Sequence, residues 1–91
     1  MNKKLSKTAL KRYKQWLALK YPICQICNQK QAQDAHHLRF GCYGADKDDT
    51  SLIAVDRECH EWCHQNKHES QEKYEHIAKE NWEKYANAHR S

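Results

Sequence analysis

Two adjacent histidines, His36 and His37, are the residues of this chain whose types and spacing are best suited to chemistry. Neighbouring side chains on an extended strand point to opposite faces, so one imidazole can hold a metal ion while the other faces a substrate. A second pair, His60 and His64, is spaced i, i+4. On a helix this spacing puts both rings on one face, where they can converge on a single ion. Together the two pairs predict a metal-dependent hydrolase.

The cysteines predict a second metal. Cys24 and Cys27 have the C-x2-C spacing of a zinc knuckle, and a tetrahedral thiolate site is closed and stabilising. The chain has five cysteines, an odd number, and the first residues, which lack an apolar run, are not expected to act as a signal peptide. We therefore expect a reducing cytoplasm and metal binding in preference to disulfides. If no zinc is bound, the alternative is that these thiols are small buried core residues.

The composition explains why a bound metal would help. A chain of 91 residues is expected to form one domain, and 38% hydrophobic residues with a mean hydropathy of −1.20 leave little core to spare. A metal could make up the deficit. No apolar run approaches membrane-spanning length, so no membrane partner is expected.

Charge is concentrated at one end. Residues 1–33 carry eight Lys/Arg and no Asp/Glu, whereas residues 34–91 carry eight Lys/Arg and twelve Asp/Glu. The basic end is the candidate for contact with a polyanion, through Lys7, Lys11, Arg12 and Lys14. A solvated helix face is the alternative interpretation.

Periodicity predicts an α+β fold. Ser6 is expected to cap a helix that Pro22 ends by Tyr21. A short strand ending near His37 or Leu38, a loop marked by Gly41 and Gly44, and a second strand over residues 51–55 should form a hairpin. Helices are predicted from Asp56 to about Asn66 and from about Ser70 to His89. Their apolar stripes are Leu10, Tyr13, Trp16 and Leu17 in the first helix and Tyr74, Ile77, Ala78, Trp82, Tyr85 and Ala86 in the last.

Three segments together resemble the HNH endonuclease family: Cys24 with Cys27, the stretch DAHHLRF (34–40), and LIAVDRECHEWCH (52–64). They are particularly similar to small HNH proteins of phages and prophages, and the matched core covers about residues 22–68. The resemblance implies a single domain with the ββα-metal fold. Its parts would be a basic N-terminal helix (1–21), the ββα-metal core (22–68) and a C-terminal helix (69–91).

The resemblance also implies roles for the histidines. His36, His60 and His64 would hold the catalytic divalent metal, which could be Mg²⁺, Mn²⁺, Ni²⁺ or Zn²⁺. His37 would be the general base that activates water. Arg39 could bind a phosphate, although a salt bridge to a loop aspartate is the alternative. The asparagine that gives the family its name is missing, so Ser51, or alternatively Thr50, would have to brace the loop.

Many HNH proteins complete a zinc site with a second CxxC, but here the matching residues run from Asp56 to Cys59. Asp56, Cys59 and Cys63 fall at i, i+3 and i+7 on one helix face. The fourth ligand beside Cys24, Cys27 and Cys59 is therefore expected to be Cys63 or Asp56, with Cys63 preferred for its softness toward zinc. Cys42 is a less favoured candidate.

The function that the resemblance implies is an endonuclease that nicks or cuts DNA in the cytoplasm of a bacterial or phage-infected cell, leaving a 5′-phosphate and a 3′-hydroxyl. No small-molecule cofactor is expected, and sequence preference would come from DNA shape or a partner protein. A homodimer and a phage or host protein partner are both compatible with the sequence. The main alternative is a non-catalytic zinc module that binds nucleic acid or protein, and a third interpretation is a scaffold for recombination or packaging.

Overall fold

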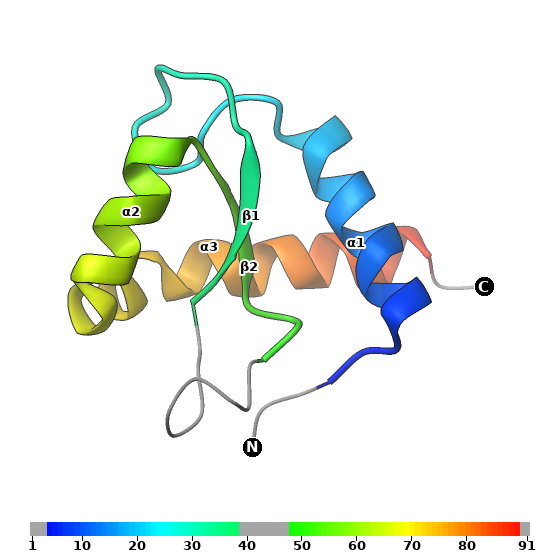
Figure 1. The fold of residues 1–91 in the computed structure, drawn as a ribbon. Helices are drawn as coiled ribbons and strands as arrows, with labels where there is room; N and C mark the ends of the chain where they lie inside the picture. The colour runs from blue at the N-terminus through cyan, green and yellow to red at the C-terminus, as the bar shows by residue number, and fades with distance from the viewer. Residues whose placement is uncertain (1–3, 39–47, 90–91) are drawn as a thin grey trace.

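The structure of the protein, a computed structural model, describes residues 4–38 and 48–89. Within them the chain is a small α+β protein in which three helices surround a two-stranded antiparallel hairpin (Figure 1). The elements are α1 (Lys7–Lys20), β1 (Asp34–His37), β2 (Leu52–Val55), α2 (Arg57–Gln65) and α3 (Lys67–Ala88). The order β1, β2, α2 is compatible with a ββα arrangement. None of the described helices is long and apolar enough to cross a membrane.

Helix α1 begins and ends where the sequence predicts. The Ser6 side chain accepts a hydrogen bond from the Ala9 N–H at 3.1 Å, which satisfies one of the free amides of the first turn. The helix ends at Lys20, two residues before Pro22. Its predicted apolar face is confirmed, because Tyr13 and Leu17 are buried and Leu10 and Trp16 pack beside them.

Strand β2 lies at the centre of the molecule, and all four of its residues are buried. Leu52 packs with Tyr13 and Leu17 of α1 in one core cluster, whereas Ile53 and Val55 point the other way, to Cys24 and Ala78. Strand β1 covers one edge of β2, with His36 opposite Ile53 and His37 opposite Leu52. The hairpin therefore fixes the direction of each histidine.

Helix α3 crosses the hairpin and joins both core clusters (Figure 1). Tyr74, Ile77 and Ala78 pack against one cluster, and Trp82 and Tyr85 against the other. The ring of Tyr13 lies 4.7 Å from that of Tyr85, so these aromatic residues are packing residues, as the stripe predicts.

Two details of α3 differ from the prediction. The helix begins at Lys67 and not near Ser70, because Asn66 alone separates it from α2: its amide donates back to the carbonyl of Trp62, and its own carbonyl accepts from the Ser70 N–H. Ala86, which was placed on the apolar stripe, is exposed. It lies one turn beyond Trp82, past the part of the helix that faces the hairpin.

A buried amide pair fastens the segment after α1 to the rest of the core. Asn81 of α3, 1% exposed, exchanges hydrogen bonds of 2.9 and 3.0 Å with Gln25 and donates to the Leu52 carbonyl. Gln25 also bonds Ala54 of β2 through its backbone N–H and its side chain. The turn that carries Cys24 and Cys27 is thus held at a fixed place beside β2.

Candidate metal centres

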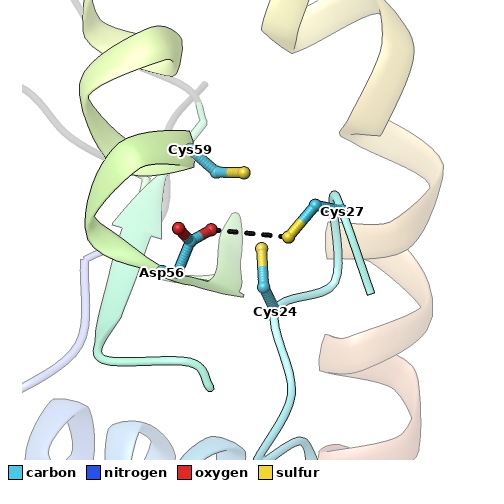
Figure 2. A group of neighbouring side chains, drawn as sticks. All are labelled: Cys24, Cys27, Asp56 and Cys59. Atoms are coloured by element: carbon cyan, nitrogen blue, oxygen red, sulfur yellow. Dashed lines mark hydrogen bonds between the residues drawn. The ribbon is translucent and has the colours of Figure 1, made fainter. Parts of the chain in front are cut away.

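Four side chains from two distant segments form the first centre, which we call the sulfur site: Cys24, Cys27, Asp56 and Cys59. Their ligand atoms all lie within 4.8 Å of one another. Cys24 and Cys27 come from the turn after α1, Asp56 stands immediately before α2, and Cys59 lies in the first turn of α2. Figure 2 shows the four side chains pointing toward one another. The group could hold a metal ion.

The turn around the first two cysteines has the chemistry of a metal-binding knuckle. The Ile26 N–H donates to the Cys24 Sγ at 3.4 Å. Asn28 adopts a left-handed conformation, with φ of 57°, which asparagine tolerates better than most residues. The backbone N–H groups of Gln29 and then Lys30 donate toward Cys27 and lower the pKa of its thiol. Such bonds favour the thiolate, which is the form that binds metals.

Asp56 does not make the hydrogen bond that is expected at its position. It stands at the N-cap of α2, where an aspartate usually accepts a hydrogen bond from the first turn, yet its side chain makes no capping bond. Its Oδ1 instead accepts from the Cys27 thiol at 3.7 Å (Figure 2). Hydrogen bonding from the thiols, Cys59 first and Cys24 next, lowers the pKa of Asp56 to about 2. Burial, reinforced by Asp56, raises the pKa of the Cys59 thiol.

Of the two candidates for the fourth position, the structure brings Asp56 to the sulfur site and not Cys63. Cys63 is seven residues after Asp56, which corresponds to about 10 Å along the axis of α2. It is buried, and burial raises the pKa of its thiol to about 11, with the Ser70 side chain opposing the shift. Softness toward zinc favoured Cys63, but only the start of α2 lies beside the knuckle. Cys42 is outside the described residues.

The second centre, which we call the histidine site, consists of His36, His60 and His64, and one ligand nitrogen from each again lies within 4.8 Å of the others. The sequence grouped these three residues, and the structure brings them together. The centre of the His36 ring lies 4.9 Å from the centre of the His60 ring and 5.0 Å from that of the His64 ring. His36 is buried, His60 is partly buried and His64 is exposed, so the site opens toward solvent at one end.

A carboxylate orients one of these rings. The Nδ1 of His60 lies 3.2 Å from Asp34 Oδ2, and with the proton on Nδ1 the ring donates to the carboxylate and leaves Nε2 for an ion. That Nε2 lies 3.0 Å from the Nε2 of His64. Two nitrogens bound at about 2.1 Å to one ion are separated by about 3.0 to 3.4 Å when their bond angle is between 90° and 109°. The donor set and its spacing therefore fit a divalent cation.

His37 faces away from the histidine site, as adjacent residues on a strand must. Its Nε2 lies 2.9 Å from Asp49 Oδ1, and the other oxygen of Asp49 accepts from the Leu5 N–H at 2.8 Å. Burial alone would raise the pKa of Asp49, but the bonds from Leu5 and His37 outweigh it and the pKa lies below its ordinary value.

Ser51 and Thr50, the candidates for bracing the loop, lie at the turn before β2. The Ser51 hydroxyl donates to the Asp48 carbonyl at 2.7 Å, and the Thr50 hydroxyl donates to Asp48 Oδ1 at 2.7 Å. Both side chains thus bond within this turn. Arg39 lies outside the described residues.

Sequence reasoning missed Asp34 and Asp49 as partners of the histidines. The i, i+4 pattern of His60 and His64 carries no information about Asp34, which is 26 residues from His60. For Asp49 a signal was available, because a hairpin that pairs His37 with Leu52 also brings the residues just before Leu52 close to His37.

Of the basic residues of α1, Lys14 lies nearest the histidine site. Lys7, Lys11, Arg12 and Lys14 are all exposed. A hollow of about 450 Å³ along α1 is lined by Lys7, Lys11 and Lys14. Lys14 and Ala18 also line a second hollow, of about 340 Å³, whose other walls include Asp34 and His60. A surface with basic residues therefore extends from α1 to the edge of the histidine site.

Comparison with protein-family models, with curated proteins and with solved structures finds no significant match. The function is therefore inferred from the geometry of the two sites and of the surface beside them.

Proposed function

We propose that this protein is a metal-dependent endonuclease of the HNH type that hydrolyses DNA phosphodiester bonds, by nicking or cutting. The observation that carries the proposal is that the two adjacent histidines of β1 have different partners. His36 joins His60 and His64 in a group that can hold a cation, while His37, one residue later, has a carboxylate partner of its own. A metal ligand beside an oriented imidazole is what hydrolysis of a phosphodiester by activated water requires.

Each residue has a part in the proposed reaction. A divalent cation held by His36, His60 and His64 would neutralise charge on the phosphate and on the leaving 3′ oxygen. His37, held by Asp49, takes a proton from the attacking water as the general base. The lysines of α1 contact backbone phosphates, with Lys14 nearest the site. Arg39 remains a predicted phosphate ligand.

The sulfur site is proposed to hold a structural zinc ion through Cys24, Cys27, Cys59 and Asp56. Thiolates suit zinc, and a site with four protein ligands leaves no position for substrate. The orientation of Asp56 supports this assignment, because its carboxylate faces the three sulfur atoms and does not cap the first turn of α2. In this proposal zinc joins the knuckle to the start of α2.

Nicking of supercoiled plasmid tests the proposal. Purified protein is incubated with plasmid and Mg²⁺, Mn²⁺, Ni²⁺ or EDTA, beside the variants His37→Ala and His76→Ala. His76 is an exposed histidine of α3 and serves as the matched control. We expect cleavage that requires metal, falls by about 10²- to 10⁴-fold in His37→Ala and is unchanged in His76→Ala.

Plasmid binding without cleavage under every metal would contradict the proposal, as would equal cleavage by all three proteins. The first result would favour a zinc-stabilised module that binds nucleic acid.

A further inference from the structure

The buried carboxylate of Asp49 lies between two donors that are far apart in the sequence. Asp49 is 5% exposed, and each of its oxygens has a different partner: Oδ1 faces His37 Nε2 at 2.9 Å, and Oδ2 accepts from the Leu5 N–H at 2.8 Å. The Leu5 amide belongs to the segment that leads into α1. One side chain thus connects the start of the chain to the proposed base.

The identity of these partners determines the position of a proton. An ionised carboxylate can only accept hydrogen bonds, and the bonds that lower the pKa of Asp49 keep it ionised. The Nε2 of His37 must then donate, so in the neutral ring Nε2 carries the hydrogen and Nδ1 carries the lone pair. The other tautomer would set a lone pair against a carboxylate oxygen.

We propose that Asp49 is the positioning residue that holds His37 in its Nε2–H tautomer, so that Nδ1 is the atom that takes the proton from water. The role as base rests on the proposed function, whereas the tautomer can be measured without any activity.

The Leu5 amide makes the carboxylate hard to replace. Asparagine has the same shape as aspartate but offers one accepting oxygen and one donating NH₂. The Leu5 N–H can only donate, so it requires the oxygen, and the NH₂ group of an asparagine at position 49 would face His37 Nε2. Nε2 would then have to accept, the ring proton would move to Nδ1, and the proposed base atom would be blocked.

Nitrogen NMR of selectively ¹⁵N-histidine-labelled protein reads the tautomer directly. Spectra are recorded on folded wild type and Asp49→Asn at a pH where the imidazole is neutral, with His37→Gln to assign the signal. We expect Nε2–H in the wild type and Nδ1–H in Asp49→Asn. The matched control, Asp48→Asn, removes the neighbouring carboxylate, whose Oδ1 accepts from Thr50, and should leave the His37 signal unchanged.

A second variant tests the part played by Leu5. Leu5→Pro removes the amide hydrogen, so in the double variant Asp49→Asn/Leu5→Pro the amide oxygen is free to turn to His37 and the Nε2–H tautomer should return. Asp49→Asn/Leu5→Ala keeps the amide hydrogen and should not recover. Nicking should follow the tautomer. We expect it to fall about 10⁴-fold in Asp49→Asn, the loss that a wrong tautomer causes in another His–Asp pair, and to recover at least about tenfold in the proline double variant.

The outcomes separate this inference from the proposed function. A wild-type protein with the Nδ1–H tautomer overturns the inference even if Asp49→Asn fails to fold, and so does a folded Asp49→Asn that keeps Nε2–H. If the wild type has the expected tautomer and Asp49→Asn reverses it, the positioning of His37 by Asp49 stands even where no metal supports cleavage, and only the nuclease fails.

Discussion

The sulfur site and the histidine site both use α2, yet they differ in how they meet solvent. The sulfur site lies at the N-terminal end of the helix, where Asp56 and Cys24 are buried and Cys27 and Cys59 are partly buried, so none of its four residues is exposed. The histidine site continues along the helix to His64, which is exposed. A closed set of four ligands is suited to holding a structure together, whereas three ligands open at one end leave room for water and phosphate. The difference supports the proposed stabilising role of the sulfur site and the proposed reactive role of the histidine site.

The sharpest way to break this comparison is to remove metal from the protein. We expect chelation at the sulfur site to unfold the chain, with loss of the helical circular dichroism signal. Binding of structural zinc is worth about 10–16 kcal/mol in small domains, and a whole domain is typically stable by only about 5–15 kcal/mol.

The double variant His60→Ala/His64→Ala is the control, because it lacks two ligands of the other site and should unfold on chelation in the same way. A wild-type spectrum that stays helical while all cysteines react with a thiol reagent would contradict a structural role for the sulfur site.

Single ligand substitutions should produce a crossover between stability and activity. Cys24→Ala removes a buried ligand, and we expect little folded protein at ordinary zinc concentrations. His64→Ala changes an exposed side chain, so the free energy of unfolding should change by about 0.5 kcal/mol or less. Plasmid nicking should nevertheless fall at least about 10²-fold. Thermal melts and nicking rates measured on the same preparations check both halves, and equal effects on stability would remove the distinction between the sites.

Asn81 tests how far the sulfur site depends on its support. Asn81→Ala deletes the side chain that bonds Gln25 and the Leu52 carbonyl, leaving buried polar groups without their partner. We expect a loss of about 2–4 kcal/mol in urea unfolding and weaker zinc retention. Asn87→Ala, an exposed change on the same helix, should shift stability by about 0.5 kcal/mol or less. Equal effects of the two variants would show that the Gln25–Asn81 pair contributes nothing.

The smallest predicted effect concerns the partner of His60. Asp34→Asn removes the charge that orients this ring, and we expect the histidine site to bind Ni²⁺ or Co²⁺ about 10- to 100-fold more weakly while the sulfur site is unchanged. Metal titrations followed by visible absorption distinguish the sites, because thiolate and imidazole ligands give different spectra. Glu61→Gln, at an exposed position of α2, is the control. Weakening of both sites together would mean that Asp34 supports the fold and not one ligand.

Sequence patterns predicted the helices, the strands and most residues of the two candidate metal sites, because these features depend on the spacing of residues close together in the chain. Ser6 and Pro22 act on their own helix, and His60 and His64 share a helix face whatever surrounds them. The choice of Asp56 over Cys63 could not be made from sequence, since both residues lie on the same face of α2 and only the position of the knuckle along the axis separates them. Asp34, Asp49 and Asn81 act on residues 12 to 56 positions away, and no periodic signal reports such contacts.

Cys59 and His60 are consecutive residues of one rigid helix, and each belongs to a different site. An ion bound at either site therefore restrains the same turn of α2 and reduces the conformational freedom that the other ion would have to remove. Linkage is reciprocal. If zinc at the sulfur site raises the affinity of the histidine site for a cation, that cation raises the affinity of the sulfur site for zinc by the same factor. A cell that lowers free zinc would thereby lower the occupancy of both sites.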